Sequence, residues 1–122
     1  MKVNKPWGYE IRWAINDKYL GKILHINAGH RLSKQYHKYK DETIYVLNGS
    51  LLLEIGPHHE VAKAEDPLKE VLREGSNRRI RPGIIHRYCA DVGDVTLIEV
   101  STPEIDDVVR LEDDYDRSTG NN

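Results

Sequence analysis

One continuous stretch determines the predicted fold of this chain and carries its first metal-ligand candidates. It reads Gly29-His30-Arg31-Leu32-Ser33-Lys34-Gln35-Tyr36-His37-Lys38-Tyr39-Lys40-Asp41-Glu42-Thr43-Ile44-Tyr45-Val46-Leu47-Asn48-Gly49. Successive side chains of an extended strand point to opposite faces, so Gln35 and His37 would share one face. Lys40-Asp41 reads as a turn, and the β-branched and aromatic run from Thr43 to Leu47 stops at Asn48-Gly49. This pattern predicts a β-hairpin.

The predicted hairpin would bring potential metal ligands together. Folding its second strand onto the first would place the Glu42 carboxylate beside His37 and Gln35, and His86 follows the Pro82-Gly83 turn later in the chain. A lone histidine on a half-buried strand is more often a hydrogen-bonded side chain than a ligand. Imidazole, carboxylate and amide together suit one divalent ion, zinc first, with Mn, Fe, Co or Ni as alternatives. The alternative is a barrel without a metal ion, in which these side chains fill the space and form hydrogen bonds.

These residues resemble the two sequence motifs of the cupin superfamily. The first motif is matched by Gly29, Gln35, His37, Glu42 and Gly49, with Gln35 in place of the first histidine, and the second by Gly75, Gly83 and His86. Arg81 stands where the second motif usually has proline, with Pro82 beside it. The resemblance implies an all-β cupin fold, the double-stranded β-helix or jelly-roll barrel.

Gln35 points to one branch of that superfamily. The phosphomannose isomerase branch also has Gln-x-His at this position, and nearly the whole chain is similar to it. The further matching segments are Lys5-Pro6-Trp7-Gly8, Lys22, Arg31-Leu32-Ser33, His86-Arg87 and residues 107–113. The chain most resembles single-domain cupins related to the C-terminal part of the bifunctional mannose-phosphate isomerase and guanylyltransferase proteins. The resemblance implies a metal-dependent isomerase or epimerase of a sugar phosphate or nucleotide sugar, with an aldose–ketose isomerase as the first candidate.

Bulk composition is that of an ordinary globular domain. The chain has 122 residues, of which 39% are hydrophobic and 31% charged, and its formal net charge is −2. This near balance gives no electrostatic reason to expect nucleic-acid or acidic-membrane binding. The single cysteine, Cys89, forms no internal disulfide, and no segment reads as a signal peptide or membrane span. We therefore expect a cytoplasmic protein.

Many short strands separated by Gly, Pro, Asn and Asp, with little helical periodicity, predict an antiparallel barrel or sandwich. We expect one domain over residues 1–117 and a flexible tail at 118–122. Residues 58–67 are polar, which indicates a long hairpin loop or a short helical turn. Residues 102–117 combine acidic residues with apolar anchors, and we expect extended chain with one short helix.

Four further residues are candidates for chemistry or substrate binding. Lys22 precedes the first motif, and Glu99 interrupts an apolar strand. Either would serve as a catalytic base, although a solvated lysine and a carboxylate paired with a lysine are the plain alternatives. Arg31 and Arg87 are candidates for binding an anionic substrate group, because guanidinium forks bind phosphate and carboxylate bidentately. Most surface arginines bind nothing.

Two other function classes remain open beside the isomerase. One is a non-catalytic sugar-binding or regulatory cupin, because a fold does not fix a function. The other is a cupin oxygenase, although Gln35 departs from the usual iron ligand set. We also expect a homodimer, because the N-terminal aromatic residues Trp7, Tyr9 and Trp13 offer more apolar surface than a small barrel covers.

Overall fold

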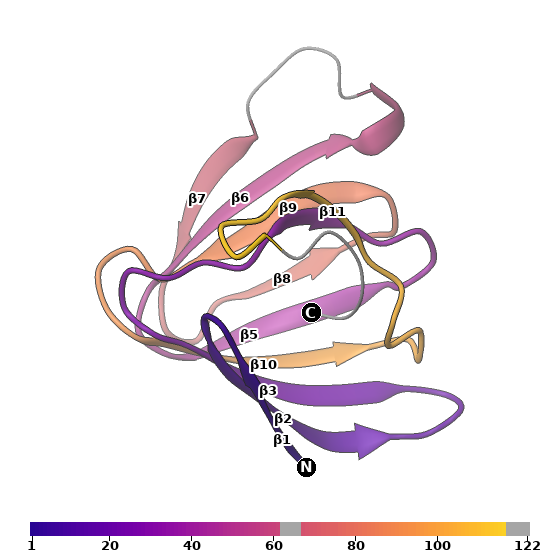
Figure 1. Ribbon diagram of the computed structural model, residues 1–122, viewed down its shortest axis with the longest axis horizontal. Helices are drawn as coiled ribbons and strands as arrows, with labels where there is room; N and C mark the ends of the chain where they lie inside the picture. Colours follow the sequence, from indigo (N-terminus) through magenta and orange to yellow (C-terminus); the bar gives the residue numbers. More distant parts are fainter. Residues whose placement is uncertain (62–66, 117–122) are drawn as a thin grey trace.

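The computed structural model describes residues 1–61 and 67–116, whose regular secondary structure is almost entirely β (Figure 1). The strands are β1 (Lys2–Lys5), β2 (Gly8–Ile15), β3 (Leu20–Ile26), β4 (Lys34–Tyr36), β5 (Glu42–Asn48), β6 (Leu51–His58), β7 (Leu68–Leu72), β8 (Asn77–Ile80), β9 (Ile84–Cys89), β10 (Val95–Ser101) and β11 (Val109–Glu112). One short 3₁₀ helix, η1, spans His59–Val61.

The strands form two antiparallel sheets that face each other (Figure 1). The six-stranded sheet has the order β1-β2-β3-β10-β5-β8, and the five-stranded sheet has the order β11-β4-β9-β6-β7. Strands distant in sequence are neighbours in both sheets, because the chain crosses repeatedly between the layers. This arrangement confirms the predicted all-β jelly-roll barrel.

The core lies between the sheets and follows the two-residue period of the strands. Ile44 and Val46 of β5 and Leu51 and Leu53 of β6 are fully buried, whereas the residues between them are more exposed. Trp7, in the turn between β1 and β2, is also fully buried. Each such side chain contributes about 1.5–3 kcal/mol on leaving water. Apolar packing therefore contributes a large part of the stability of the barrel.

The glycines that matched the two motifs have a backbone reason for their identity. Gly29, Gly49, Gly75 and Gly83 all have positive φ, between 82° and 85°, where residues with a Cβ are strained. Gly83 is also tightly packed, since a Cβ there would lie 2.2 Å from Nε2 of His58. Its N–H donates to the carbonyl of His37 at 2.6 Å. This bond ties the turn before His86 directly to the first motif.

The short helix predicted within residues 102–117 is absent from the described part of that segment. Residues 102–116 contain no helix; they run as irregular chain and then form β11, which pairs with β4 at the edge of the five-stranded sheet. In that register Val109 lies opposite Tyr36, so β11 pairs with residues over seventy positions earlier in the chain. Such pairing overrides weak local propensity. The predicted short helix is therefore wrong.

Three other sequence predictions concern residues 58–67, the C-terminal tail and the N-terminal aromatic residues. The helical turn expected within 58–67 is present as η1, while residues 62–66 and the predicted tail at 118–122 lie outside the described part of the chain. Of the three N-terminal aromatics, Trp7 is buried in the core and Tyr9 stacks on His25, which leaves Trp13, 53% exposed, on the surface. Among the described residues no helix has the length and apolar character to cross a membrane.

Candidate metal centre

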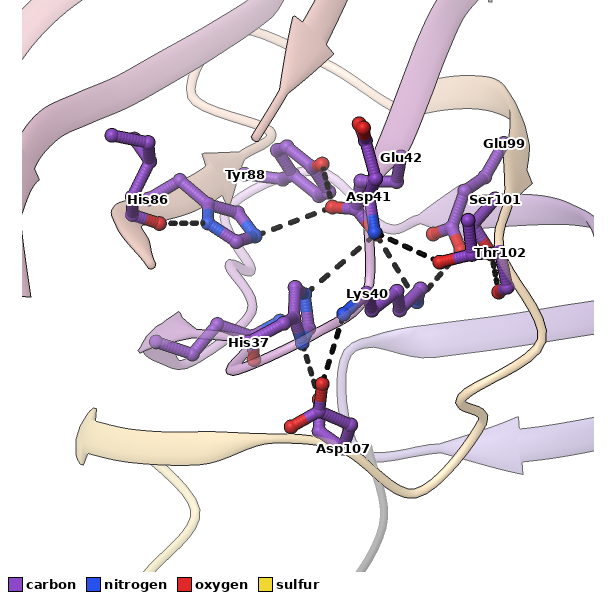
Figure 2. A network of polar contacts seen from close by, with 12 residues as sticks. His37, Lys40, Asp41, Glu42, His86, Tyr88, Glu99, Ser101, Thr102 and Asp107 are labelled. Atoms are coloured by element: carbon purple, nitrogen blue, oxygen red, sulfur yellow. Dashed lines mark hydrogen bonds and ion pairs between the residues drawn. The ribbon is translucent and has the colours of Figure 1, made fainter. Parts of the chain in front are cut away.

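Three of the four predicted ligands meet inside the barrel (Figure 2). His37 follows β4, Glu42 is the first residue of β5, and His86 lies within β9. One donor atom from each lies within 4.8 Å of the others, and all three side chains are buried. The Glu42 oxygens lie 3.7 Å from Nε2 of His37 and 3.3 Å from Nε2 of His86.

The hydrogen bonds of the two histidines orient them as metal ligands. Nδ1 of His37 faces the backbone carbonyl of Asp107 at 2.5 Å, and Nδ1 of His86 faces the carbonyl of Ile84 at 2.9 Å. A carbonyl only accepts, so each Nδ1 carries a proton in these bonds and each Nε2 keeps a lone pair in the neutral ring. Both Nε2 atoms and Oε2 of Glu42 are buried and form no hydrogen bond, while Oε2 forms an ion pair of 3.1 Å with the ammonium group of Lys40. These residues therefore fit a divalent metal ion.

Gln35, the fourth predicted ligand, lies beside the cluster. It is buried on β4, directly opposite His86 in the sheet register, and lines the same small interior space as Glu42. Its Oε1 accepts a hydrogen bond of 2.6 Å from the hydroxyl of Ser33. An amide oxygen has a second lone pair, so this bond leaves it able to bind a metal ion. The role of Gln35 as a ligand stays a prediction.

Lys40 is a component of the site that the sequence did not reveal. Its ammonium group is buried and lies 3.1 Å from Glu42 and 2.9 Å from Glu99 (Figure 2). Although burial opposes its charge, the two carboxylates raise the pKa of Lys40 well above its usual range. Lys40 is therefore a permanent cation beside the metal ligands. The sequence indicated only that Lys40 lies in a turn, and a turn lysine exposed to solvent would give the same sequence pattern as this buried one.

Glu42 is the centre of this network. Its Oε1 accepts a 2.6 Å hydrogen bond from the hydroxyl of Tyr88. Burial alone would raise the pKa of the Glu42 carboxyl, but Lys40 and then His37 outweigh it, and the pKa lies well below its usual range. Burial lowers the pKa of His37, but Glu42 outweighs that effect and the net pKa is raised. A proton therefore competes with a metal ion for Nε2 of His37.

The two predicted catalytic residues also face the interior. Lys22 of β3 and Glu99 of β10 are direct neighbours in the sheet register, and both are buried. Lys22 pairs with Glu10 at 3.2 Å, whereas Glu99 pairs with Lys40. Glu99 thus has the lysine partner that its position in an apolar strand required. Their roles as acid or base stay predictions.

Arg31 and Arg87 lie away from the metal-ligand cluster. Arg87 follows His86 on β9 and so points to the other face of the strand, where it donates to the carbonyls of Leu32 and Glu112 at 2.8 and 3.2 Å. Arg31 forms a bidentate pair with Asp114 at 2.7 and 3.0 Å. Both arginines line an outer groove of about 290 Å³. A role in anion binding stays a prediction, and in this structure it would belong to that groove.

Asp107 positions the loop that carries His37 and Lys40. Its carboxylate accepts hydrogen bonds from the backbone N–H groups of Lys38, Tyr39 and Lys40 at 3.0, 2.7 and 3.0 Å. Its carbonyl oxygen binds the His37 ring. The sequence indicated Asp107 only as part of a matching C-terminal run, and no local pattern connects it with a loop nearly seventy residues earlier.

The interior space at the cluster is small. It is lined by Glu42, Lys40, Glu99, Lys22 and Gln35 among others, and its volume is about 10 Å³. A space of this size holds about one water molecule. A sugar does not fit inside the closed barrel.

The fold is shared with solved structures of low sequence identity. KdgF from Halomonas sp. is 17% identical with a TM-score of 0.69, over 85% of this chain and 88% of that chain. An RmlC-like cupin from Shewanella frigidimarina is 16% identical with a TM-score of 0.69, over 84% and 83%. The capsular polysaccharide assembling protein CapF from Staphylococcus aureus is 15% identical with a TM-score of 0.78, over 92% of this chain but 34% of that chain. At these identities the likeness shows the fold alone.

Sequence comparison gives a more specific assignment. No curated protein matches the chain. The family described as "Mannose-6-phosphate isomerase C-terminal" matches residues 1–113, which include every residue of the candidate centre. The chain is therefore a cupin that belongs to the mannose-6-phosphate isomerase C-terminal family.

Proposed function

We propose that this cupin binds one divalent metal ion through His37, Glu42 and His86, with Gln35 as a fourth ligand, and isomerises or epimerises a sugar phosphate or a nucleotide sugar. The observation that supports the metal is the convergence of two buried imidazole nitrogens and one carboxylate oxygen that have no hydrogen-bond partner. Zinc is the first candidate ion, since it accepts this mixture of nitrogen and oxygen ligands.

Each residue then has a proposed role in the reaction. The ion would act as a Lewis acid on the substrate carbonyl. An aldose–ketose isomerisation moves one proton between adjacent carbons and one between their oxygens, with no net change. Glu99 is the candidate base that would move the proton between the two carbon atoms. Lys40, which contacts both Glu99 and Glu42, would hold the Glu99 carboxylate in place. Lys22, paired with Glu10, would orient an anionic oxygen.

The charge of the interior favours an anionic ligand. Two groups of ion pairs lie on the inner side of the six-stranded sheet and together contain four cations and three carboxylates: Glu10 with Lys5, Arg12 and Lys22, and Lys40 with Glu42 and Glu99. A divalent ion would add to this positive excess. Uncompensated buried charge is costly, so a ligand that brings negative charge would be favoured over a neutral one.

The small interior volume supports a second candidate, a metal-binding cupin without catalysis that serves as a regulatory or sugar-binding module. A hexose is far larger than a space of about 10 Å³. The isomerase proposal therefore requires the wall of the barrel to open. The segment 102–108, irregular in structure and fastened by Asp107, is the part of the wall that we expect to move.

Metal binding is tested by titrating chelator-treated protein with Zn²⁺ and Co²⁺ in a calorimeter and by recording the visible absorption of the Co²⁺ form. We expect one ion per chain in the wild type and none in the His37→Ala and His86→Ala variants, all with unchanged circular dichroism. His59→Ala is the matched control, because His59 lies in η1 outside the cluster. Full metal occupancy in either cluster variant would reject the ligand assignment.

Isomerisation is tested separately, by proton exchange in deuterated water over a panel of hexose 6-phosphates and sugar nucleotides. We expect exchange at the carbon next to the carbonyl, and its loss in Glu99→Gln. Thermal shifts should also rank the phosphorylated sugar above the free sugar. A protein that binds the ion but exchanges no proton with any member of the panel would favour the non-catalytic module.

A further inference from the structure

The outer groove that contains Arg31 and Arg87 continues beyond these two residues across the five-stranded sheet. It consists of two adjoining hollows, each of about 290 Å³, which share Lys34, Pro67 and Glu112 in their walls. The first hollow also contains Arg31, Glu54, Lys69 and Arg87, and the second contains Gly56, Pro57, Ile85 and Leu111. The groove therefore has a charged end and an apolar end, and its size is within the about 300–1,000 Å³ of small-molecule sites.

Strand pairing places the charged residues of the groove in one row across the sheet. Each of the five strands β7, β6, β9, β4 and β11 contributes one residue, in the order Lys69, Glu54, Arg87, Lys34 and Glu112. Lys34 and Arg87 are neighbours because the residues next to them, Gln35 and His86, lie directly opposite each other in antiparallel strands. The row is thus fixed by the backbone of the sheet.

Arg87 is a buried cation whose charge is only partly compensated. Its side chain is 3% exposed, and its guanidinium group donates to the backbone carbonyls of Leu32 and Glu112. Among the described residues, the carboxylate that pairs with it is Asp114, at 3.7 Å. Asp114 already forms the bidentate pair with Arg31. Two guanidinium groups therefore share one carboxylate, and a further anion beside them would be favoured.

The charge balance of the groove also favours an anion. Lys34 pairs with Glu112 at 3.4 Å, whereas Lys69 forms no ion pair within residues 1–61 and 67–116. With Asp114 included, the groove holds four cations and three carboxylates, which leaves one positive charge in excess. Apart from the shared Lys34 and Glu112, the other end is uncharged. A ligand that matches both ends has one anionic group and an apolar body.

We propose that the outer groove is a second ligand site, separate from the metal centre, that binds a small organic anion. The phosphate or carboxylate group of this ligand would contact Arg31, Lys34 and Arg87, because guanidinium forks bind both groups bidentately. Its apolar body would lie on Ile85 and Leu111. Since Arg87 and His86 point to opposite sides of β9, this ligand would lie outside the barrel and the metal ion inside it.

The test titrates the 122-residue chain with phenyl phosphate, which combines an anionic group with an apolar ring, and follows the backbone N–H signals by NMR. We expect a dissociation constant of about 1 mM or lower, with the largest shift changes at residues 31–34, 85–87 and 110–112. Inorganic phosphate, which lacks the ring, and phenol, which lacks the charge, should each bind at least about 10-fold more weakly. Phenylacetate distinguishes a carboxylate site from a phosphate site, and tight binding of either anion in the groove supports the proposal.

Arg31→Met and Arg79→Met form a matched pair of variants. Both side chains are partly exposed, at 43% and 54%, and both form a bidentate pair with an aspartate, Arg31 with Asp114 and Arg79 with Asp41 on the other sheet. We expect Arg31→Met to weaken phenyl phosphate binding by about 10-fold or more and Arg79→Met to leave it unchanged.

The apolar end is tested by Leu111→Ser, at a position 48% exposed, which should remove the advantage of phenyl phosphate over inorganic phosphate. Val71→Ser, on β7 of the same sheet but outside the groove and 60% exposed, should keep that advantage. Circular dichroism of each variant checks that it is folded.

His86→Ala separates this proposal from the metal site, because it removes a candidate metal ligand and should bind phenyl phosphate like the wild type. Three results would overturn the proposal. One is no binding of phenyl phosphate or phenylacetate at about 10 mM, and another is shift changes confined to the interior around His37 and Glu42. The third is an equal loss of affinity in Arg31→Met and Arg79→Met.

Discussion

Replacing Lys40 by methionine tests whether the buried ion pairs of Lys40 stabilise the fold. Methionine keeps the length and apolar stem of lysine but removes the ammonium group that lies 3.1 Å from Glu42 and 2.9 Å from Glu99. Both carboxylates are buried, so water cannot take the place of the ammonium group unless the barrel rearranges. The substitution therefore leaves two carboxylates together in the interior.

The expected loss of stability follows from these distances. At an effective dielectric constant of about 20, charges 3.1 and 2.9 Å apart attract by about 5 and 6 kcal/mol. Desolvation of the ammonium group offsets much of this, and breaking a buried ion pair from one side typically costs about 3–5 kcal/mol. We expect Lys40→Met to lower the free energy of unfolding by that amount, a large part of the roughly 5–15 kcal/mol of a small domain.

The assay is urea unfolding of chelator-treated protein at pH 7, followed by fluorescence. Lys38→Met is the matched control, because Lys38 is exposed in the same loop and only its backbone N–H contacts Asp107. Lys40→Met/Glu99→Gln should recover part of the loss, and Zn²⁺ should stabilise Lys40→Met more than the wild type, because a cation next to Glu42 has been removed. A Lys40→Met protein within 1 kcal/mol of the wild type would refute the reasoning.

Two other predictions concern positions outside the ligand set. Asp107→Ala should weaken Zn²⁺ binding by about 10–100-fold in calorimetry, because it frees the loop that carries His37, while Asp106→Asn at the exposed neighbour should not. If Asp107→Ala bound Zn²⁺ as tightly as the wild type, the hydrogen bonds of Asp107 would not be needed to position the loop. Burial alone would raise the pKa of Glu10, but Lys22, Arg12 and Lys5 outweigh it, and the pKa is lowered. Its ion pairs therefore stabilise the fold above the ordinary carboxyl pKa of 4.5 and are lost as the pH falls through the lower folded value. Glu10→Gln should thus show a shallower fall in unfolding free energy from pH 5 to pH 3 than the wild type, and an identical slope would contradict this.

The sequence was sufficient for the fold and for most of the ligand cluster because both depend on local patterns. Turn glycines, alternating strands and the spacing of Gln35, His37 and Glu42 are visible within one stretch. The positions of Lys40 and Asp107 were not predictable in this way. Each depends on contacts with residues about sixty to seventy positions away, which β pairing sets and composition does not. Arg87 follows His86 in sequence but points to the other side of the strand, so its predicted role in anion binding would belong to the outer groove.

Strand alternation also relates the inner and outer faces of the six-stranded sheet. A strand with one face in the core and one in water normally places apolar residues inside and polar residues outside. Near the metal-ligand cluster, β3, β10 and β5 reverse this order, with Lys22, Glu99 and Glu42 inside. Their neighbours Ile23, Ile98 and Val100 point outward. Buried charged residues are common at functional sites, and contiguous exposed apolar faces are common where another surface covers them. The proposed site therefore accounts for the charged side of these strands, and the homodimer expected from the sequence would account for the apolar side.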